Sequence, residues 1–218
     1  MDVILFSNSD TAIIAINEKN KKSFSQVDES LAEVLSYSSP NLASRVLSAD
    51  DVFQNGNIRY RAISAKILFQ NPRLFIPRFI SLVKSSFSLK KIPSESSFII
   101  SIEGIIVNKT GVILESNYLD SFTLYESYSG FNIKNELYKN IKQKNIHLID
   151  PAKALFNGII SEVSEIKKPS LFISACNKVE FSLLEKNGGQ SRINLGSITI
   201  PELNNYPINF LLTKPGLD

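Results

Sequence analysis

Apolar positions along the chain follow two spacings, one typical of strands and one typical of helices. Alternating or β-branched runs predict two N-terminal strands, Met1–Phe6 and Thr11–Ile16, joined by the turn formers Ser7–Asp10. A hairpin is predicted from Phe98–Val107 and Val112–Tyr125, with Gly111 at the last position of its turn. Later strands are predicted over Leu171–Ala175 and in a second hairpin around Asn187–Gln190.

Helical spacing recurs between these strands. It predicts helices over Val27–Tyr37 and around Leu42–Leu47, and one that begins at Pro77. Ile133, Leu137 and Ile141 are spaced by four and predict another, and Asp150–Pro151 indicates the start of a last one. The segment Ile58–Phe69 fits both a strand and a helix, because its apolar residues match either period.

The order of these elements is strands, helices, hairpin, helices and hairpin, without a regular βαβ repeat. It therefore favours an α+β fold with a mainly antiparallel sheet built from hairpins and several short helices packed on it. Residues 1–218 are interpreted as one domain, with a weak boundary near Ser94 left open because serines cluster there.

Composition limits the class of protein. Of 218 residues, 43% are hydrophobic and 21% charged, which is ordinary globular usage. The single cysteine, Cys176, allows no intrachain disulfide and is typical of a reducing compartment. The first residues do not resemble a signal peptide, and no apolar run approaches the roughly 20 residues that span a bilayer. We therefore expect a cytoplasmic, intracellular protein without a transmembrane segment.

The common catalytic and metal-binding patterns are missing. His147 is the only histidine and lies in an apolar run, and Cys176 has no CxxC partner, so both are interpreted as structural, with their roles left open. Gly188–Gly189 belongs to a predicted hairpin and does not open a phosphate-binding helix. The sequence thus predicts no catalytic residue, no metal and no cofactor, although an active site made of carboxylates is not excluded.

Charge is distributed unevenly along the chain. The net charge is +3, yet the 43 residues Val52–Ser94 contain no Asp or Glu. Aromatic residues on faces that the pattern assigns to the core, such as Phe75 and Phe79, lie between the basic residues of this stretch. The remainder of the chain carries 16 basic and 21 acidic residues. The eight basic residues of the acid-free stretch are Arg59, Arg61, Lys66, Arg73, Arg78, Lys84, Lys90 and Lys91.

The acid-free stretch gives the leading functional hypothesis. We expect a non-enzymatic structural or interaction protein whose eight basic residues dock an anionic partner, which is another protein or a further copy of the same chain. A structural protein of a virus or phage would fit this profile. The alternatives are a nucleic-acid-binding protein, docking to an anionic membrane surface, and an unrecognised transferase-type enzyme with a carboxylate-lined cleft.

Overall fold

The computed structural model describes residues 1–7, 11–18, 52–55, 57–151, 154, 168–175, 179–186 and 190–193. The helices predicted over Val27–Tyr37 and around Leu42–Leu47 lie outside these residues, as does Cys176. In the described part, no helix is long and apolar enough to cross a membrane.

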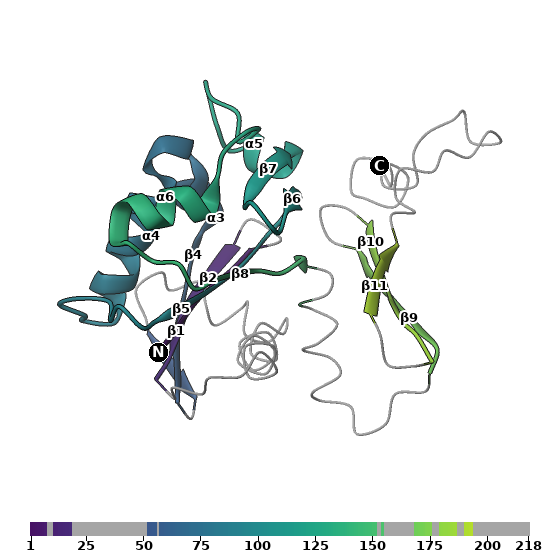
Figure 1. Ribbon diagram of the computed structural model, residues 1–218, viewed down its shortest axis with the longest axis horizontal. Helices are drawn as coiled ribbons and strands as arrows, with labels where there is room; N and C mark the ends of the chain where they lie inside the picture. Colours follow the sequence, from purple (N-terminus) through teal and green to yellow (C-terminus); the bar gives the residue numbers. More distant parts are fainter. Residues whose placement is uncertain are drawn as a thin grey trace.

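A six-stranded sheet forms the centre of the molecule (Figure 1). The N-terminal hairpin is confirmed, because Val3 pairs with Ile16 and Phe6 with Ile13 in an antiparallel register. The chain then extends this hairpin on both sides. In spatial order the strands are β3 (Phe53–Asn55), β4 (Ile58–Ser64), β2 (Thr11–Asn17), β1 (Asp2–Ser7), β5 (Ser97–Ile102) and β8 (Ile146–Leu148).

The prediction of a mainly antiparallel sheet is wrong, because the sheet is mixed. β5 pairs in parallel with β1, and β8 pairs in parallel with β5. The first crossover contains β2, β3 and β4, so it is not a short βαβ unit. The predicted hairpin strand Phe98–Val107 is also divided, since β5 ends at Ile102 and Gly104 turns the chain with a φ of 139°.

The hairpin itself is shorter than predicted. It consists of β6 (Ile105–Val107) and β7 (Val112–Glu115), which are antiparallel. After β7 the chain enters the short helix α5 (Asn117–Asp120) and does not continue as a strand to Tyr125. Gly104 is needed here, because a Cβ at this position would lie 2.8 Å from the carbonyl oxygen of Glu115.

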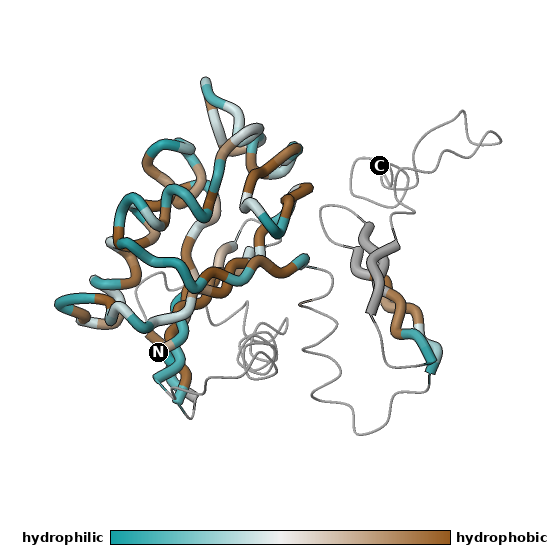
Figure 2. Tube along the Cα trace, viewed as in Figure 1, coloured by the Kyte–Doolittle hydropathy of each residue, from teal (hydrophilic) through white to brown (hydrophobic). Residues whose placement is uncertain are grey.

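Three helices accompany one face of the sheet: α3 (Ala65–Phe69), α4 (Pro72–Ser86) and α6 (Ile133–Ile141) (Figure 1). The ambiguous segment therefore uses both periods, as a strand to Ser64 and as a helix from Ala65. The core beneath the helices is a continuous cluster that includes strand residues such as Leu5 and Ile100 and helix residues such as Phe79. In Figure 2 the central strands of this sheet are mostly brown, and all of β1 and all of β5 except Ser97 are buried.

Helix α4 begins five residues earlier than predicted. Asn71 is its N-cap, and the Asn71 side chain accepts a hydrogen bond of 2.9 Å from the backbone N–H of Arg73. Pro72 therefore takes the first helical position, where its missing N–H costs nothing. Pro77 lies inside the helix and is exposed, so its ring faces away from the core.

A separate three-stranded antiparallel sheet is formed by β9 (Ser170–Ala175), β10 (Val179–Leu184) and β11 (Gln190–Ile193). The predicted strand Leu171–Ala175 and the second hairpin are confirmed. Helix α6 agrees with its predicted spacing, and residues 151 and 154 are helical after Asp150.

The register defines two edges of the parallel strands. Asp2 lies beside Ser97, and Phe98 beside Ile146, at the edge where β1, β5 and β8 begin. We call this the amino edge. At the opposite edge, which we call the carboxyl edge, Ser7 lies beside Ile102. Helices α4 and α6 each precede a parallel strand, so their C-terminal ends lie at the amino edge.

Candidate functional site

The eight predicted binding residues divide between the two ends of α4. Five lie near its C-terminal end, at the amino edge, and three lie near its N-terminal end. The first group is Arg59, Arg61, Lys84, Lys90 and Lys91, and the second is Lys66, Arg73 and Arg78. The structure therefore brings together a majority of these cations. Lys66 and Arg73 lie at the other end of α4, and Arg78 lies near the middle of the helix with its guanidinium at the Ile67 carbonyl oxygen.

Arg59 and Arg61 project from β4 toward the last turn of α4. Arg59 lies 5.6 Å from the centre of the Phe87 ring and forms an ion pair of 2.6 Å with Glu18. The Nη1 of Arg61 donates a hydrogen bond of 3.2 Å to the Oγ of Ser86. Cations at this position are favourable because the C-terminal carbonyls of a helix carry partial negative charge. These two arginines thus have a structural role in addition to any binding role.

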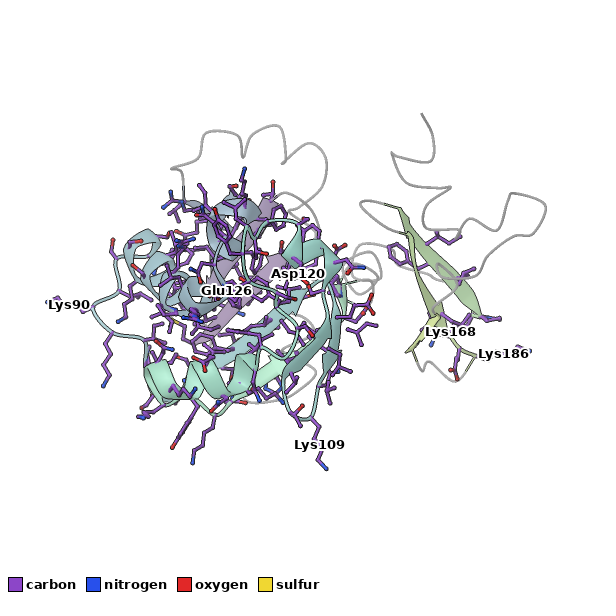
Figure 3. All side chains as sticks on the ribbon, turned by 90° about the horizontal axis from the view of Figure 1, so that it is seen from above. Lys90, Lys109, Asp120, Glu126, Lys168 and Lys186 are labelled. Atoms are coloured by element: carbon purple, nitrogen blue, oxygen red, sulfur yellow. The ribbon has the colours of Figure 1, made fainter. Side chains whose placement is uncertain are left out.

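The three lysines of the first group extend further into solvent. Lys84 is half-buried in the last turn of α4, whereas Lys90 and Lys91 are exposed in the loop before β5. That loop is held by a hydrogen bond of 2.9 Å from the Leu89 N–H to the Lys84 carbonyl oxygen. Lys90 projects from the margin of the molecule in Figure 3.

Two further lysines reach the same edge from α6. Lys142 is the C-cap of α6 with a φ of 58°, and its ammonium lies 5.3 Å from the centre of the Tyr138 ring. The ammonium of Lys144 lies 5.6 Å from the same ring. The segment that carries both lysines is tied to the start of β5, since the Asn145 Nδ2 donates a hydrogen bond of 2.5 Å to the Ser97 Oγ.

The sequence reasoning missed Lys142 and Lys144 because they lie outside the acid-free stretch. The signal that could have found them is the recurrence of lysine at 139, 142 and 144 around the end of a predicted helix. We define the basic edge as the six cations that the fold gathers here from β4, α4, the loop before β5 and the segment after α6: Arg61, Lys84, Lys90, Lys91, Lys142 and Lys144.

Carboxylates reduce the charge of this edge only in part. Glu18 is engaged with Arg59. Glu95 is exposed beside the lysine loop, where it accepts a hydrogen bond of 3.3 Å from the Ser94 hydroxyl. Among the residues that the structure describes, cations therefore outnumber carboxylates at this edge, and most of these cations are exposed lysines.

The three cations of the second group are held apart from this edge. Lys66 is exposed on α3. Arg73 pairs with Glu126, with 3.2 Å between its Nε and the carboxylate. Arg78 donates a hydrogen bond through Nη1 to the Ile67 carbonyl oxygen.

Five aromatics of the acid-free stretch belong to the core. These aromatic side chains lie between the basic residues in the sequence, and all of them are buried: Tyr60, Phe69, Phe75, Phe79 and Phe87. They therefore offer no exposed ring on which a nucleic-acid base could stack.

The carboxyl edge has a different chemistry. Glu103 follows β5 and is 2% exposed, Asp150 follows β8, and the Ser7 Oγ at the end of β1 lies 3.5 Å from the Tyr118 hydroxyl. His147 does not join them, because its Nε2 lies 2.9 Å from the Asn145 Oδ1 at the amino edge. Within the residues that the structure describes, no three His, Cys, Asp or Glu side chains are grouped to hold a metal ion.

Comparison with known proteins gives little further information. No protein family matches the sequence, and no curated protein matches it. Among solved structures, the chain is similar to the Lmo2764 protein, a putative N-acetylmannosamine kinase, from Listeria monocytogenes. The TM-score is 0.47 with 10% sequence identity over 91% of this chain and 53% of that chain. The chain thus spans about half the length of that protein, and a likeness of this extent carries no conclusion about function.

Proposed function

We propose that the protein is a non-enzymatic interaction protein that docks an acidic surface of another protein through the basic edge. The observation that carries this proposal is the gathering of cations from separate elements, β4, α4 and the segment after α6, at one edge of the sheet. Charges that gather on one face add their fields, which steers an oppositely charged partner into place and sets its orientation.

An acidic protein fits this edge better than a single strand of nucleic acid. Binding of single strands relies on exposed aromatic rings as well as charge. Five aromatic side chains in the described part of the acid-free stretch are buried, and the ring of Tyr138, a residue that is 41% exposed, has the ammonium groups of Lys142 and Lys144 over it. What the edge offers is a set of exposed ammonium groups, which suits carboxylates on a protein surface.

A charge-reversal experiment tests the proposal. Lys90, Lys91 and Lys144 are exposed, so changing all three to Glu should leave the fold intact. The matched control changes three other exposed lysines to Glu, which alters the net charge equally, and these are Lys109, Lys168 and Lys186 (Figure 3). Binding of fluorescein-labelled poly-L-glutamate is measured by anisotropy at low and moderate salt.

We expect the basic-edge variant to lose affinity by roughly tenfold or more, because each lost charge contact contributes to binding at low salt. The control variant should stay close to the wild type. Equal losses in both variants would mean that only net charge matters and would contradict the proposal. Tighter binding of a DNA duplex than of poly-L-glutamate would identify nucleic acid as the partner in place of an acidic protein. The logarithm of the binding constant should then fall with the logarithm of the salt concentration, with a slope of about 0.9 per phosphate contacted.

We propose, as a second candidate, a transferase-type enzyme that binds its ligand at the carboxyl edge. The observation that favours it is the position of Glu103 and Asp150, which follow neighbouring parallel strands. Ligands of sheets with parallel strands commonly bind outside the carboxyl ends of those strands. Glu103 is buried, and burial of a carboxylate costs free energy that hydrogen bonds or ion pairs have to offset.

Thermal unfolding of the Glu103→Gln variant separates this candidate from a structural role. A side chain kept for ligand chemistry is commonly a cost to stability, so Glu103→Gln should raise Tm. A lower Tm would show that the Glu103 carboxylate supports the fold, and would count against the enzyme.

A further inference from the structure

Four large apolar side chains are exposed around the N-terminal end of α4, opposite the basic edge. Ile67 on α3 is 60% exposed and Leu74 in the first turn of α4 is 47% exposed. Leu124 and Tyr125, in the loop between α5 and α6, are 74% and 94% exposed. We call Ile67, Leu74, Leu124 and Tyr125 the apolar patch.

Contacts beneath the patch show that its two parts are neighbours. The ion pair between Arg73 and Glu126 joins the residue before Leu74 to the residue after Tyr125. The Tyr128 hydroxyl donates a hydrogen bond of 3.1 Å to the carbonyl oxygen of Phe69, at the end of α3. Figure 1 shows the loop between α5 and α6 rising at the same end of the molecule as α3.

The loop that carries Leu124 and Tyr125 is held firmly at its base. The Asp120 carboxylate accepts a hydrogen bond of 2.6 Å from the Tyr128 backbone N–H and another of 2.9 Å from the Ser127 hydroxyl. The Asp120 carbonyl oxygen also accepts a hydrogen bond from the backbone N–H of Thr123. Exposed apolar residues on a loop that is ordered in advance bind a partner at a lower entropic cost than residues on a floppy loop.

Positive charge surrounds the patch. Lys66 is exposed next to Ile67, and Arg73 is 82% exposed next to Leu74. Arg78 lies on α4 one turn further along, with its guanidinium at the Ile67 carbonyl. Two carboxylates also lie here: Glu126, which is paired with Arg73, and Asp120, which is hydrogen-bonded within the loop. A partner that complements both features presents carboxylates around apolar side chains.

We propose that the apolar patch docks an acidic segment of another protein, whose apolar side chains contact Leu124 and Tyr125 and whose carboxylates face Lys66 and Arg73. Tyrosine is enriched among the residues that dominate binding energy, and a surrounding rim of charge adds orientation. This surface is separate from the basic edge, and it needs both apolar and acidic groups in its partner, whereas the basic edge needs acidic groups alone.

The test uses three fluorescein-labelled synthetic peptides that form helices, measured by anisotropy on the full chain. The first contains glutamate with leucine at helical spacing, the second replaces each leucine with serine, and the third replaces each glutamate with lysine. The variant is Leu124→Ser with Tyr125→Ser, whose side chains are exposed and leave the base of the loop intact. The control is Leu171→Ser with Ile173→Ser on β9, at similarly exposed apolar positions.

We expect the glutamate–leucine peptide to bind more tightly than both other peptides, and the Leu124→Ser, Tyr125→Ser variant to weaken that binding by roughly tenfold. The β9 control should not change it, and neither should Lys90→Glu with Lys91→Glu and Lys144→Glu, which affects only the basic edge. Equal binding of the serine peptide, or binding unchanged by loss of Leu124 and Tyr125, overturns the proposal. Self-association that disappears in the same variant would identify a second copy of the chain as the occupant and would overturn it too.

Discussion

The two ends of helix α4 differ in what they bury and in what they expose. At the C-terminal end, Arg59 and Arg61 reach the last turn and exposed lysines surround it. At the N-terminal end, the rings of Phe69, Phe75 and Tyr128 pack together beneath a surface that exposes apolar side chains. A helix of 15 residues is about 22 Å long, so the two ends are distinct surfaces.

This difference shows how one basic stretch of sequence can serve two surfaces. Residues that are close in sequence are separated when a helix lies between them, and residues from other elements take their place. At the basic edge, Lys142 and Lys144 come from the segment after α6 and join the lysines of the acid-free stretch. At the other end, Arg73 and Lys66 surround apolar side chains instead of joining a larger positive field.

The largest expected effect is on the aromatic cluster beneath the N-terminal end. Phe75 is buried and its ring lies 5.1 Å from that of Phe69 and 6.0 Å from those of Tyr128 and Phe131, measured between centroids. Phe75→Ala should lower the free energy of unfolding by about 3–5 kcal/mol, because the cavity would remain lined by these rings. Urea denaturation measures this quantity.

Phe87→Ala provides the comparison at the C-terminal end. Phe87 is also buried, but the Arg59 side chain lies over its ring and can fill part of the space. We therefore expect a smaller loss there. A loss as large as that of Phe75→Ala would contradict the view that the aromatic cluster makes the N-terminal end of α4 the more rigid one. If Phe75→Ala does not fold, Phe75→Leu takes its place in the comparison.

A smaller effect is expected from the side chain that holds the loop. Asp120→Ala removes both carboxylate hydrogen bonds, to the Tyr128 N–H and to the Ser127 hydroxyl. We expect the free energy of unfolding to fall by about 1.5–3 kcal/mol, as for hydrogen bonds to a charged group. Chymotrypsin should cleave after Tyr125 much faster in this variant than in wild type.

Glu136→Ala is the control, since the Glu136 side chain forms an ion pair with Lys139 on the surface of α6 and is not a partner in the hydrogen bonds of the Asp120 carboxylate. An unchanged cleavage rate in the Asp120→Ala variant would show that the loop keeps its shape without the carboxylate.

The Tyr128 hydroxyl, at the same end of α4, should make the free energy of unfolding depend on pH. Burial raises the pKa of Tyr128 well above its ordinary value, with Arg78 opposing the shift and Asp120 adding to it. In the unfolded chain a tyrosine has a pKa of about 10. Above that pH the unfolded state loses a proton that the folded state keeps, so stability falls as pH rises, by about 1.4 kcal/mol at pH 11.

Tyr128→Phe isolates this contribution. At neutral pH it should cost about 1 kcal/mol, because the hydrogen bond to the Phe69 carbonyl is lost. The phenylalanine cannot ionise, so the difference in Tm between variant and wild type should narrow or reverse by pH 11. A difference in Tm between variant and wild type that stays constant from pH 8 to pH 11 would show that Tyr128 does not cause the loss of stability at high pH.

Several elements could be predicted from local pattern alone. The hairpin of β1 and β2 and the helix at Ile133–Ile141 appear where the spacing of apolar residues placed them. The two strands pair with each other across a short connection, and the helix buries one face, so local spacing decides both elements. The start of α4 was missed, because Asn71 and Pro72 form an N-cap and first helical position as good as that expected at Pro77.

Strand pairing was predicted wrongly for a physical reason. Alternation shows where a strand is, but it does not show which strand lies beside it. A signal was present, since Val3–Phe6 and Phe98–Ile100 are continuous apolar runs, which are typical of strands buried on both faces in parallel sheets. The candidate site was predicted in part for the same reason, because the acid-free stretch is linear whereas the basic edge is assembled by the parallel pairing of β5 and β8.

The smallest effect on stability should come from the ion pair at the C-terminal end, yet it sharpens the comparison between the two ends most directly. Glu18 pairs with Arg59 at the surface, so Glu18→Gln should change the free energy of unfolding by less than about 1 kcal/mol. It also removes a carboxylate from the neighbourhood of the basic edge. We therefore expect binding of poly-L-glutamate to strengthen by roughly threefold at low salt and by less at high salt.

Glu126→Gln is the matched change at the N-terminal end, because Glu126 pairs with Arg73 there. If the two ends are independent, Glu126→Gln should leave the binding of poly-L-glutamate at the basic edge nearly unchanged, since about 22 Å of α4 exceeds the Debye length of roughly 8–10 Å at ordinary ionic strength. It should instead strengthen binding of the glutamate–leucine peptide to the apolar patch. The same gain for poly-L-glutamate from both substitutions would mean that the protein has one diffuse positive surface and that the two ends of α4 do not act separately.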